Sequence, residues 1–469
     1  MTRIKLIYQW LDDRLGISST IMPIIQHPVP PNLTWWYVLG SATLVAFVMQ
    51  VVTGVALAFT YVPAPSDAYE SLEFITQRAV LGNIVRGIHY WGSSAMVVLM
   101  FLHMASAYLM AAYKYPRELT WVSGVFLLVL TLAMAFTGQL LRWNQDAYWA
   151  IVLVAAQVSR VPLIGHWLTQ LVVAGQTVGG ATLTRFYATH VFLIPALTFG
   201  LIGIHLYMMT RHGVSEPPKT SGPVDPATYK QRYHEKLSRE GVPFWPDFAW
   251  KDVVFALFAG SIVLLLAIVF GAPELGERAD PTLIQAHPKP DWYFLWLYAL
   301  AALIPPELEI VMTLGMGVVG FLLVILPFIA PFGERRASRR PWAIAVVGFA
   351  TLAIGVLLWE GFRASWSPAL HARLPKEVTV KLQGSALQGG NIFQQKGCMN
   401  CHIVAGAGGL RGPELSDVGH RLSREQLTWR ILYGAHNMPA YGTTLQPEEL
   451  NALLDFLGIQ HGTKTTKGH

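Results

Sequence analysis

Seven long apolar stretches constrain the fold of this chain more than any other feature of its 469 residues. Each has roughly the 20 residues, or more, that an α-helix needs to cross the hydrocarbon core of a bilayer. Charged residues make up only 13% of the chain, whereas a soluble globular protein carries about 25%. We therefore predict an all-α polytopic membrane protein with spans over residues 35–61, 84–112, 121–141, 186–210, 253–271, 309–331 and 342–361.

An eighth apolar segment covers residues 147–175, but it is interrupted. Ser159-Arg160-Val161-Pro162 breaks its middle, and Gly165 and Gly175 follow. We predict short helices that lie at the membrane interface there, because no stretch of this segment is long enough to span the bilayer.

Lys and Arg concentrate in alternate loops between the predicted spans. They gather near Lys114, between Arg211 and Lys251, in residues 333–340 and before the first span. Because such loops stay on the cytoplasmic side, we predict a cytoplasmic N-terminus and a C-terminal domain on the outer, periplasmic side of a bacterial inner membrane. We expect the partner of these basic loops to be membrane lipid and not nucleic acid.

Four histidines interrupt two of the predicted spans. His89 and His103 are fourteen residues apart, and His190 and His205 are fifteen apart. At about 3.6 residues per turn, each pair lies near one face of its helix. The two spans run in the same direction, so His89 faces His190 near the outer surface and His103 faces His205 near the inner one. This arrangement predicts two non-covalent haem b groups, each held by two imidazoles, which suits one-electron transfer.

The alternative is a structural role, because a lone histidine in the membrane often serves as a hydrogen-bond partner between helices. Four histidines matched in level and direction argue against it. Four glycines in the neighbouring spans repeat the fourteen-residue period, and they could admit either a helix or a flat porphyrin. The shared period favours the porphyrin for these glycines, which are Gly40, Gly54, Gly124 and Gly138.

Arg86 and Arg185 stand at the outer starts of the two spans that carry the histidines. An arginine at this position is costly unless it has an anionic or polar partner. We predict that both pair with haem propionates.

The C-terminal part contains the pattern "CMNCH", residues 398–402, which includes both cysteines of the chain. C-x-x-C-H is typical of c-type haem attachment, with thioethers on Cys398 and Cys401 and with His402 as an axial ligand. An exported disulfide or half of a zinc site are the alternatives, and neither requires the adjacent histidine. We predict Met438 as the sixth ligand and the carbonyl of Pro413 as the group that orients His402.

Long ordered motifs extend this pattern over most of the chain, which resembles the cytochrome bc1/b6f family. Residues 1–215 are similar to its four-helix, dihaem cytochrome b6 part, and residues 216–362 to its three-helix subunit IV. Residues 363–390 form a predicted tether to a class I cytochrome c domain at residues 391–469. The motifs are "VPPNLTWWYVLG", "PRELTWVSGV", "GQTVGGATLTRFYATH", "HPKPDWYFLWLYALAALIP" and "RRPW".

The resemblance implies a quinol–cytochrome c oxidoreductase that works by a Q-cycle. Quinol would be oxidised near the outer surface. One electron would pass to a Rieske iron–sulfur subunit and then to haem c, and the other would cross through both b haems to an inner quinone. His89 and His190 would hold the low-potential outer haem, and His103 and His205 the high-potential inner one. We expect a soluble or membrane-bound cytochrome c, or a terminal oxidase, as the acceptor, and a homodimer as the assembly.

The motif "PDWY", residues 290–293, resembles the outer quinol-site motif of the family, in which glutamate is common at the second position. We predict that Asp291 accepts a quinol proton and that Tyr293 lines the pocket. The alternative is an ordinary acidic residue at a loop–helix junction.

Two features depart from the family pattern. Val38 stands where photosynthetic members carry a cysteine for an extra haem, so we predict no covalent haem there. The inner quinone site lacks an acidic signature. Arg211 is the first predicted contact of the quinone there, and His212 is the second. Solvated cations at a helix end are the alternative for both.

Two other functions remain as rivals. A dihaem membrane anchor would deliver quinol electrons to a dehydrogenase or reductase without dividing them between two paths. A transporter or structural protein would leave both the histidine pairs and "CMNCH" unexplained.

Overall fold

The computed structural model describes residues 3–159, 161–174, 178–219, 221–280, 288–304, 308–363, 373–408, 413–434 and 438–459. Within these ranges the chain is mostly helical, and its strands are two-residue pieces. Strand β1 (Pro28–Val29) pairs antiparallel with β2 (Val242–Pro243), and β3 (Ile403–Val404) with β4 (Ala407–Gly408).

The α-helices are α1 (Arg3–Leu15), α2 (Ile17–Ile25), α3 (Leu39–Ala58), α4 (Ala68–Gln77), α5 (Gly82–Leu109), α6 (Glu118–Leu140), α7 (Gln145–Ser159), α8 (Gly165–Val173), α9 (Gly180–Ala188), α10 (Ile194–His212), α11 (Tyr229–Glu240), α12 (Ala249–Val269), α13 (Trp292–Leu303), α14 (Glu309–Ile329), α15 (Pro341–Arg363), α16 (Lys376–Thr379), α17 (Gly384–Gln395), α18 (Val418–Arg421), α19 (Arg424–Tyr433) and α20 (Pro447–Gly458). Short 3₁₀ turns cover η1 (Trp35–Val38), η4 (Ala337–Arg339) and η5 (Cys398–Asn400), and η2 (Thr189–Leu193) is a π-turn.

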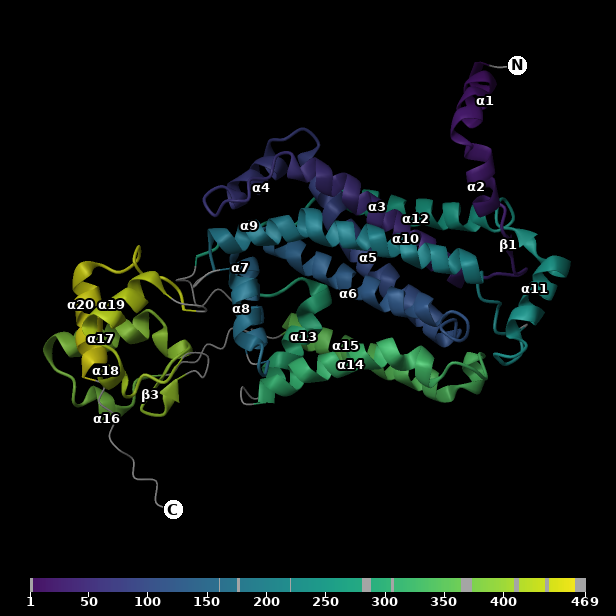
Figure 1. Ribbon diagram of the computed structural model, residues 1–469. Helices are drawn as coiled ribbons and strands as arrows, with labels where there is room; N and C mark the ends of the chain where they lie inside the picture. The colour runs from purple at the N-terminus through teal and green to yellow at the C-terminus, as the bar shows by residue number, and fades with distance from the viewer. Residues whose placement is uncertain are drawn as a thin grey trace.

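The described residues contain seven helices that are long and apolar enough to cross a membrane, each overlapping one predicted span. The boundaries differ from the prediction by a few residues, most at the fourth span, which covers α9, η2 and α10 as one rod. The segment predicted as short helices forms α7 and α8, separated near Pro162. In Figure 1 both run across one end of the bundle, roughly at right angles to the spans.

Four of the seven spans form a bundle around the histidines. Helix α3 packs on α5, and α6 packs on α10, while α12 covers α3 and α5. Helix α14 packs on α6 and α13 packs on α15. The outward faces of α12, α14 and α15 expose apolar side chains such as Leu257, Val319 and Phe349, as expected for surfaces in contact with lipid.

The π-turn η2 explains how unequal histidine spacings fit one bundle. The backbone N–H of Ile194 donates to the carbonyl of Thr189, five residues back, instead of four. Pro195 follows and has no N–H to donate to Val191, so one α-helical hydrogen bond is missing there. A π-turn accommodates one extra residue in a helix. The fifteen-residue interval in this rod therefore positions its histidines as the fourteen-residue interval does in α5.

Basic residues of the predicted cytoplasmic loops close the C-terminal ends of two spans. Arg340, which is buried, donates to the carbonyls of Tyr108 and Leu109 at the end of α5, at 2.9 Å each. Arg117 donates to the carbonyls of His212 and Gly213 at the end of α10. The last carbonyls of a helix lack partners and carry partial negative charge, so these cations stabilise the bundle.

The C-terminal domain has a hydrophobic core of its own, in which α17 packs on α20. Leu374 and Leu382 belong to this core, although both lie in the predicted tether. The domain therefore begins near Leu374 and not at residue 391. The predicted tether over 363–390 is therefore too long. Its polar composition gave no sign that Leu374 and Leu382 are buried or that α17 begins within it.

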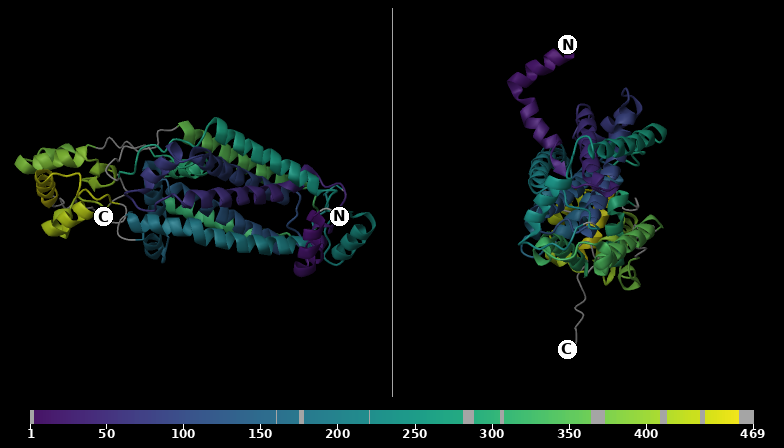
Figure 2. Two further views of the ribbon diagram at one scale, coloured as in Figure 1. Left: turned by 90° about the horizontal axis from the view of Figure 1, so that it is seen from above. Right: turned by 90° about the vertical axis from the view of Figure 1, so that its right-hand side faces the viewer.

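The small domain and the N-terminal helices lie at opposite ends of the bundle. Figure 1 shows α16 to α20 beyond the end where α4, α7 and α8 lie, whereas α1, α2 and α11 occupy the other end. The view from above in Figure 2 shows the same separation.

Candidate functional site

His89 and His190 face each other across the centre of the bundle. Their ring centroids are 6.4 Å apart and the ring planes are nearly perpendicular, at 81°. An imidazole nitrogen binds a metal ion at about 2 Å, so two rings on opposite sides of one metal have centroids about 6 Å apart. The spacing of this pair therefore fits an iron between the two rings. His103 and His205 lie close enough for their charges to interact.

A hydroxyl group on the neighbouring helix fixes the orientation of three of these rings. Thr53 Oγ1 lies 2.9 Å from His89 Nδ1, Thr137 Oγ1 lies 3.0 Å from His190 Nδ1, and Ser123 Oγ lies 2.8 Å from His205 Nδ1. Each hydroxyl also donates to a carbonyl of its own helix, at 2.7 to 2.9 Å. Because the hydroxyl proton is used there, the ring must donate from Nδ1. Nε2 then keeps its lone pair, as a metal ligand requires.

Each hydroxyl residue directly precedes one of the predicted haem-facing glycines, and every one of the four glycines faces a histidine ring. A Cβ at Gly138 would lie 2.7 Å from His190 Cε1. The corresponding distances to Cε1 are 3.1 Å for Gly40 and His103, 3.2 Å for Gly54 and His89, and 3.5 Å for Gly124 and His205. The glycines therefore leave space beside the rings, and their predicted contact with a porphyrin stays a prediction.

The fourth position of this pattern differs. Leu39 precedes Gly40, so this position lacks the hydroxyl group that contacts the histidine ring at the other three. Within the part of the chain that the structure describes, no hydrogen bond to His103 Nδ1 from a neighbouring hydroxyl is present. The outer pair of rings has two such partners, and the inner pair has one, on His205.

The predicted quinol-site residues lie together at the C-terminal end of α6. Tyr293, which is buried, donates from its hydroxyl to Asp291 Oδ2 at 2.9 Å. Arg142 Nη2 lies 2.9 Å from Asp291 Oδ1. The backbone N–H of Asp291 donates to Gln139 Oε1 at 3.1 Å. Sequence analysis did not identify Arg142, because its partner is 149 residues away.

A second carboxylate supports the start of this motif. Asp146, near the start of α7, accepts the backbone N–H of Lys289 at 2.8 Å. Burial raises the pKa of Asp146, while the hydrogen bond from Lys289 and the charge of Arg142 oppose that effect. The contact fixes the loop that precedes α13 against α7.

The three predicted arginine contacts have different surroundings. Arg86 is buried and donates to Thr76 Oγ1 and to the carbonyl of Pro273, at 2.9 Å each. Two donors of Arg86 therefore have protein partners, and its predicted contact with a haem propionate stays a prediction. Arg185 and Arg211 are exposed, on α9 and at the end of α10.

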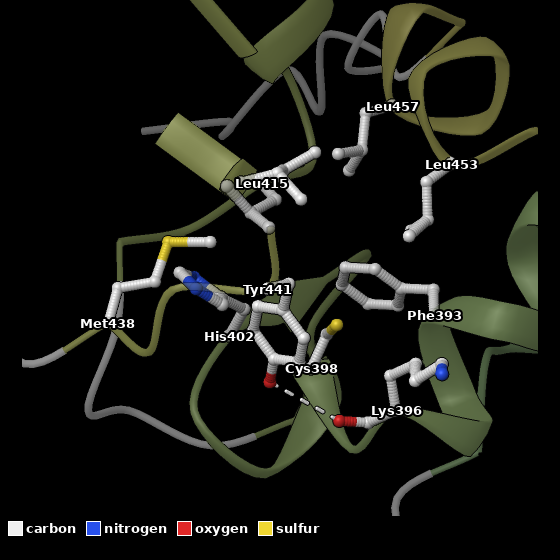
Figure 3. Close-up of a pocket in the computed structure, with 10 residues that line it drawn as sticks. Phe393, Lys396, Cys398, His402, Leu415, Met438, Tyr441, Leu453 and Leu457 are labelled. Carbon is white, nitrogen blue, oxygen red and sulfur yellow. Dashed lines mark hydrogen bonds between the residues drawn. The ribbon is translucent and has the colours of Figure 1, made fainter. Parts of the chain in front are cut away.

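The C-terminal domain contains an apolar pocket that the predicted haem c residues line together. Figure 3 shows Cys398, His402 and Met438 on its wall, with the His402 ring near the Met438 sulfur. His402 Nδ1 lies 2.8 Å from the carbonyl of Pro413, as predicted. Burial lowers the pKa of His402, although the Pro413 hydrogen bond opposes this, so the ring stays neutral at neutral pH and can bind a metal.

The two alternatives for "CMNCH" find no support in the described residues. No disulfide joins Cys398 and Cys401 in the part of the chain that the structure describes. Burial raises the pKa of Cys398 to about 12, so this sulfur is not poised as a thiolate. In the described ranges no three His, Cys, Asp or Glu side chains come together as a metal site.

Comparison with known proteins agrees with this geometry. Residues 24–213 match the family described as cytochrome b/b6/petB, and residues 278–373 match cytochrome b(C-terminal)/b6/petD. Cytochrome b6 of Synechococcus sp. (strain JA-3-3Ab) is 43% identical over 211 residues, which is 45% of this chain and 98% of that protein. Cytochrome b6 of Heliobacterium modesticaldum is 43% identical over 210 residues, covering 44% of this chain and 99% of the relative.

The chain belongs to the cytochrome b/b6 family. It joins both parts of a cytochrome b to a c-type cytochrome domain, because residues 384–457 match the family described as cytochrome C oxidase, cbb3-type, subunit III. A solved structure titled "Hyperthermophilic respiratory Complex III" is similar as well. It has a TM-score of 0.64 and 27% identity, and the match covers 76% of this chain and 91% of that one.

The cytochrome b part also contains a partly buried carboxylate that sequence analysis missed. Ser41 Oγ donates to Asp252 Oδ1 at 2.5 Å, and Ser41 directly follows Gly40, which faces His103. An ionisable residue in a membrane helix usually has a functional role. The only sequence signal was an acidic residue in the first turn of α12, and this is common in helices of every kind.

Proposed function

We propose that the chain is the cytochrome b and c subunit of a bacterial quinol–cytochrome c oxidoreductase that oxidises quinol by a Q-cycle. The facing pair His89 and His190, with its hydroxyl partners and its glycines, is the observation that supports this most directly. Facing imidazoles whose Nε2 atoms are free to bind iron suit one-electron transfer.

The residues present fit two haem b groups and one haem c. His89 and His190 would hold the low-potential outer b haem, and His103 and His205 the high-potential inner one. His402 and Met438 would bind the iron of haem c, and Cys398 and Cys401 its vinyl groups. These groups supply one-electron transfer when bound.

Side chains of this chain would accept the quinol protons and contact the quinone. Asp291 would accept a proton from quinol at the outer side, with Tyr293 holding the other oxygen of its carboxylate. At the inner side, Asp252, at the level of Gly40, and the exposed Arg211 are the proposed contacts of the quinone. Arg185 stays a proposed propionate contact.

The Q-cycle requires partners outside this chain. Both cysteines are assigned to haem c, so a separate Rieske iron–sulfur subunit would take the first electron. A cytochrome c or a terminal oxidase would accept it from haem c, and the complex would be a homodimer in a bacterial inner membrane. The N-terminus would face the cytoplasm, with the cytochrome c domain outside.

Purification of the complex from its host membrane tests this proposal. We expect b and c haems in a ratio of two to one by pyridine haemochrome spectra, a co-purifying iron–sulfur subunit and quinol-dependent reduction of cytochrome c. A complex with b haems but without an iron–sulfur subunit, coupled to a dehydrogenase, would support the membrane-anchor alternative instead.

A further inference from the structure

The ion pair between Arg142 and Asp291 joins two distant segments at the proposed quinol site. Arg142 follows α6, and Asp291 directly precedes α13. Their side chains are only 17% and 11% exposed, and the atoms Arg142 Nη2 and Asp291 Oδ1 are 2.9 Å apart. At this degree of burial an ion pair differs from a solvated surface pair, because removal of one partner leaves a charge with little water around it.

Both oxygens of the carboxylate are occupied. Arg142 donates to Oδ1, and the hydroxyl of Tyr293 donates to Oδ2 at 2.9 Å. Gln139 fixes the backbone of the same residue by accepting its N–H. The side chain is therefore held in one orientation by two donors.

Other charged and titratable groups surround this carboxylate. Asp146 approaches from α7 and Tyr90 from α5, and both interact with its charge. Lys289 lies two residues away and donates from Nζ to the carbonyl of Phe362. Arg142 is the cation in direct contact, and the negative charge of Asp146 would otherwise disfavour a second carboxylate nearby.

We propose that Arg142 is a positioning residue of the outer quinol site, which keeps Asp291 ionised and aimed until it accepts a proton from quinol. This inference depends on the role of Asp291 in the proposed function. In the step itself, the O–H bond of quinol breaks and an O–H bond forms on Asp291. The carboxylate becomes neutral and its attraction to Arg142 weakens. The electrons leave quinol by the two routes already described. Loss of the proton to the outer water restores the ion pair.

The test is the pH profile of quinol oxidation in the purified complex, measured for Arg142→Gln and Arg142→Lys. A base must be unprotonated to act, so its protonation sets the acid limb of the profile. Without the cation, we expect the acid limb of Arg142→Gln to move to higher pH by about 1 unit or more. Arg142→Lys restores the charge and should return the limb toward its wild-type position. The b-haem spectrum reports whether each variant is folded.

Two controls separate a local effect from a general one. Arg278→Gln removes an exposed ion pair with Glu70 on the outer side of the bundle, and it should leave the profile unchanged. If Arg142→Gln loses its b haems, Arg142→Met is the second neutral variant, because its unbranched apolar side chain suits a buried position. It should show the same displaced acid limb.

An unmoved acid limb in a folded neutral variant would overturn the role of Arg142. A displaced limb in Arg142→Lys equal to that in Arg142→Gln would also overturn it, because the charge would then not matter. Asp291→Asn separates this failure from that of the proposed function. If Asp291→Asn turns over at the wild-type rate, Asp291 is not the proton acceptor. If it is inactive while Arg142→Gln has a wild-type profile, only the inference about Arg142 fails.

Discussion

At the residue scale, the hydroxyl groups beside the haem-facing glycines decide the chemistry of the histidines. Thr53, Ser123 and Thr137 each use their proton in their own helix and accept one from an imidazole. An acceptor on Nδ1–H makes the ring a more basic ligand, which stabilises oxidised iron and lowers the reduction potential. With two acceptors on the pair His89 and His190 and one on the pair His103 and His205, we expect the lower potential at the first of the two proposed haem sites.

We predict that Thr137→Val raises the midpoint potential of the outer b haem. Loss of one hydrogen bond of about 1 kcal/mol sets a limit of roughly 40 mV for a one-electron couple. Optical redox titration measures the shift. Thr131→Val is the matched control, because Thr131 is buried on the same helix and its hydroxyl also donates to a carbonyl four residues back. Equal shifts in both variants would show that the contact with His190 is not the cause.

Gly138 gives a second prediction at this scale, because a Cβ at this position would lie 2.7 Å from His190 Cε1. The ring cannot shift without losing its bond to Thr137. We expect Gly138→Ala to lose the outer b-haem signal in reduced-minus-oxidised spectra and to retain the inner one. Gly200→Ala, with no atom within 4 Å of the new methyl group, should retain both signals. Retention of both signals in Gly138→Ala would contradict the tight fit.

At the element scale, the rod that combines α9, η2 and α10 shows how a helix compensates for an extra residue. A regular helix turns by about 100° per residue, so fifteen residues would rotate His205 away from the direction of His190. The π-turn before Pro195 accommodates the extra residue and so compensates for this rotation. The bundle can therefore combine intervals of fourteen and fifteen residues around the same two levels.

We predict that deletion of Phe192, an exposed residue of η2, converts the π-turn to a regular turn and retains both b haems. The interval between His190 and His205 would then equal that in α5. Deletion of Val98, which is also exposed and lies between His89 and His103, should rotate one ring by about 100° and remove at least one haem. Haem quantification in purified membranes measures both outcomes. Loss of haem in both deletions would contradict the compensating role of η2.

At the scale of the whole molecule, the chain consists of a membrane part and a small domain with separate cores. All residues of the domain core lie between Leu374 and Leu457. Leu374 and Leu382, each 6% exposed, pack beside Gly390, where an added Cβ would approach both side chains. The start of the domain is therefore set by packing and not by the change in composition.

We predict that residues 373–469, exported with the machinery for c-type haem attachment, fold alone and bind haem. A fragment of residues 391–469 should not, because it lacks Leu374, Leu382 and half of α17. Loss of one buried leucine costs about 2–5 kcal/mol, and a whole domain is stable by only about 5–15 kcal/mol. Denaturant unfolding and the c-haem absorbance measure the difference. Equal stability of the two fragments would refute the revised boundary.

The sequence by itself determined the seven spans, the pairing of the histidines, the four glycines beside them and the haem c pattern. These features depend on local apolarity and on helical periodicity, which a short stretch of sequence already contains. The contact between His402 and the Pro413 carbonyl was also predicted from the sequence, in this case from the haem c pattern.

Only the tertiary structure decided the contacts between segments that are far apart in the chain. Arg142 and Asp291 are 149 residues apart, and Ser41 and Asp252 are 211 apart. From the sequence, Arg86 is expected to pair with a haem propionate. Its hydrogen bonds to Thr76 and Pro273 are visible only in the folded chain. The hydroxyl partners of the histidines and the correction by η2 also depend on how four helices pack. Periodicity defines which face a residue occupies, but packing decides what that face meets.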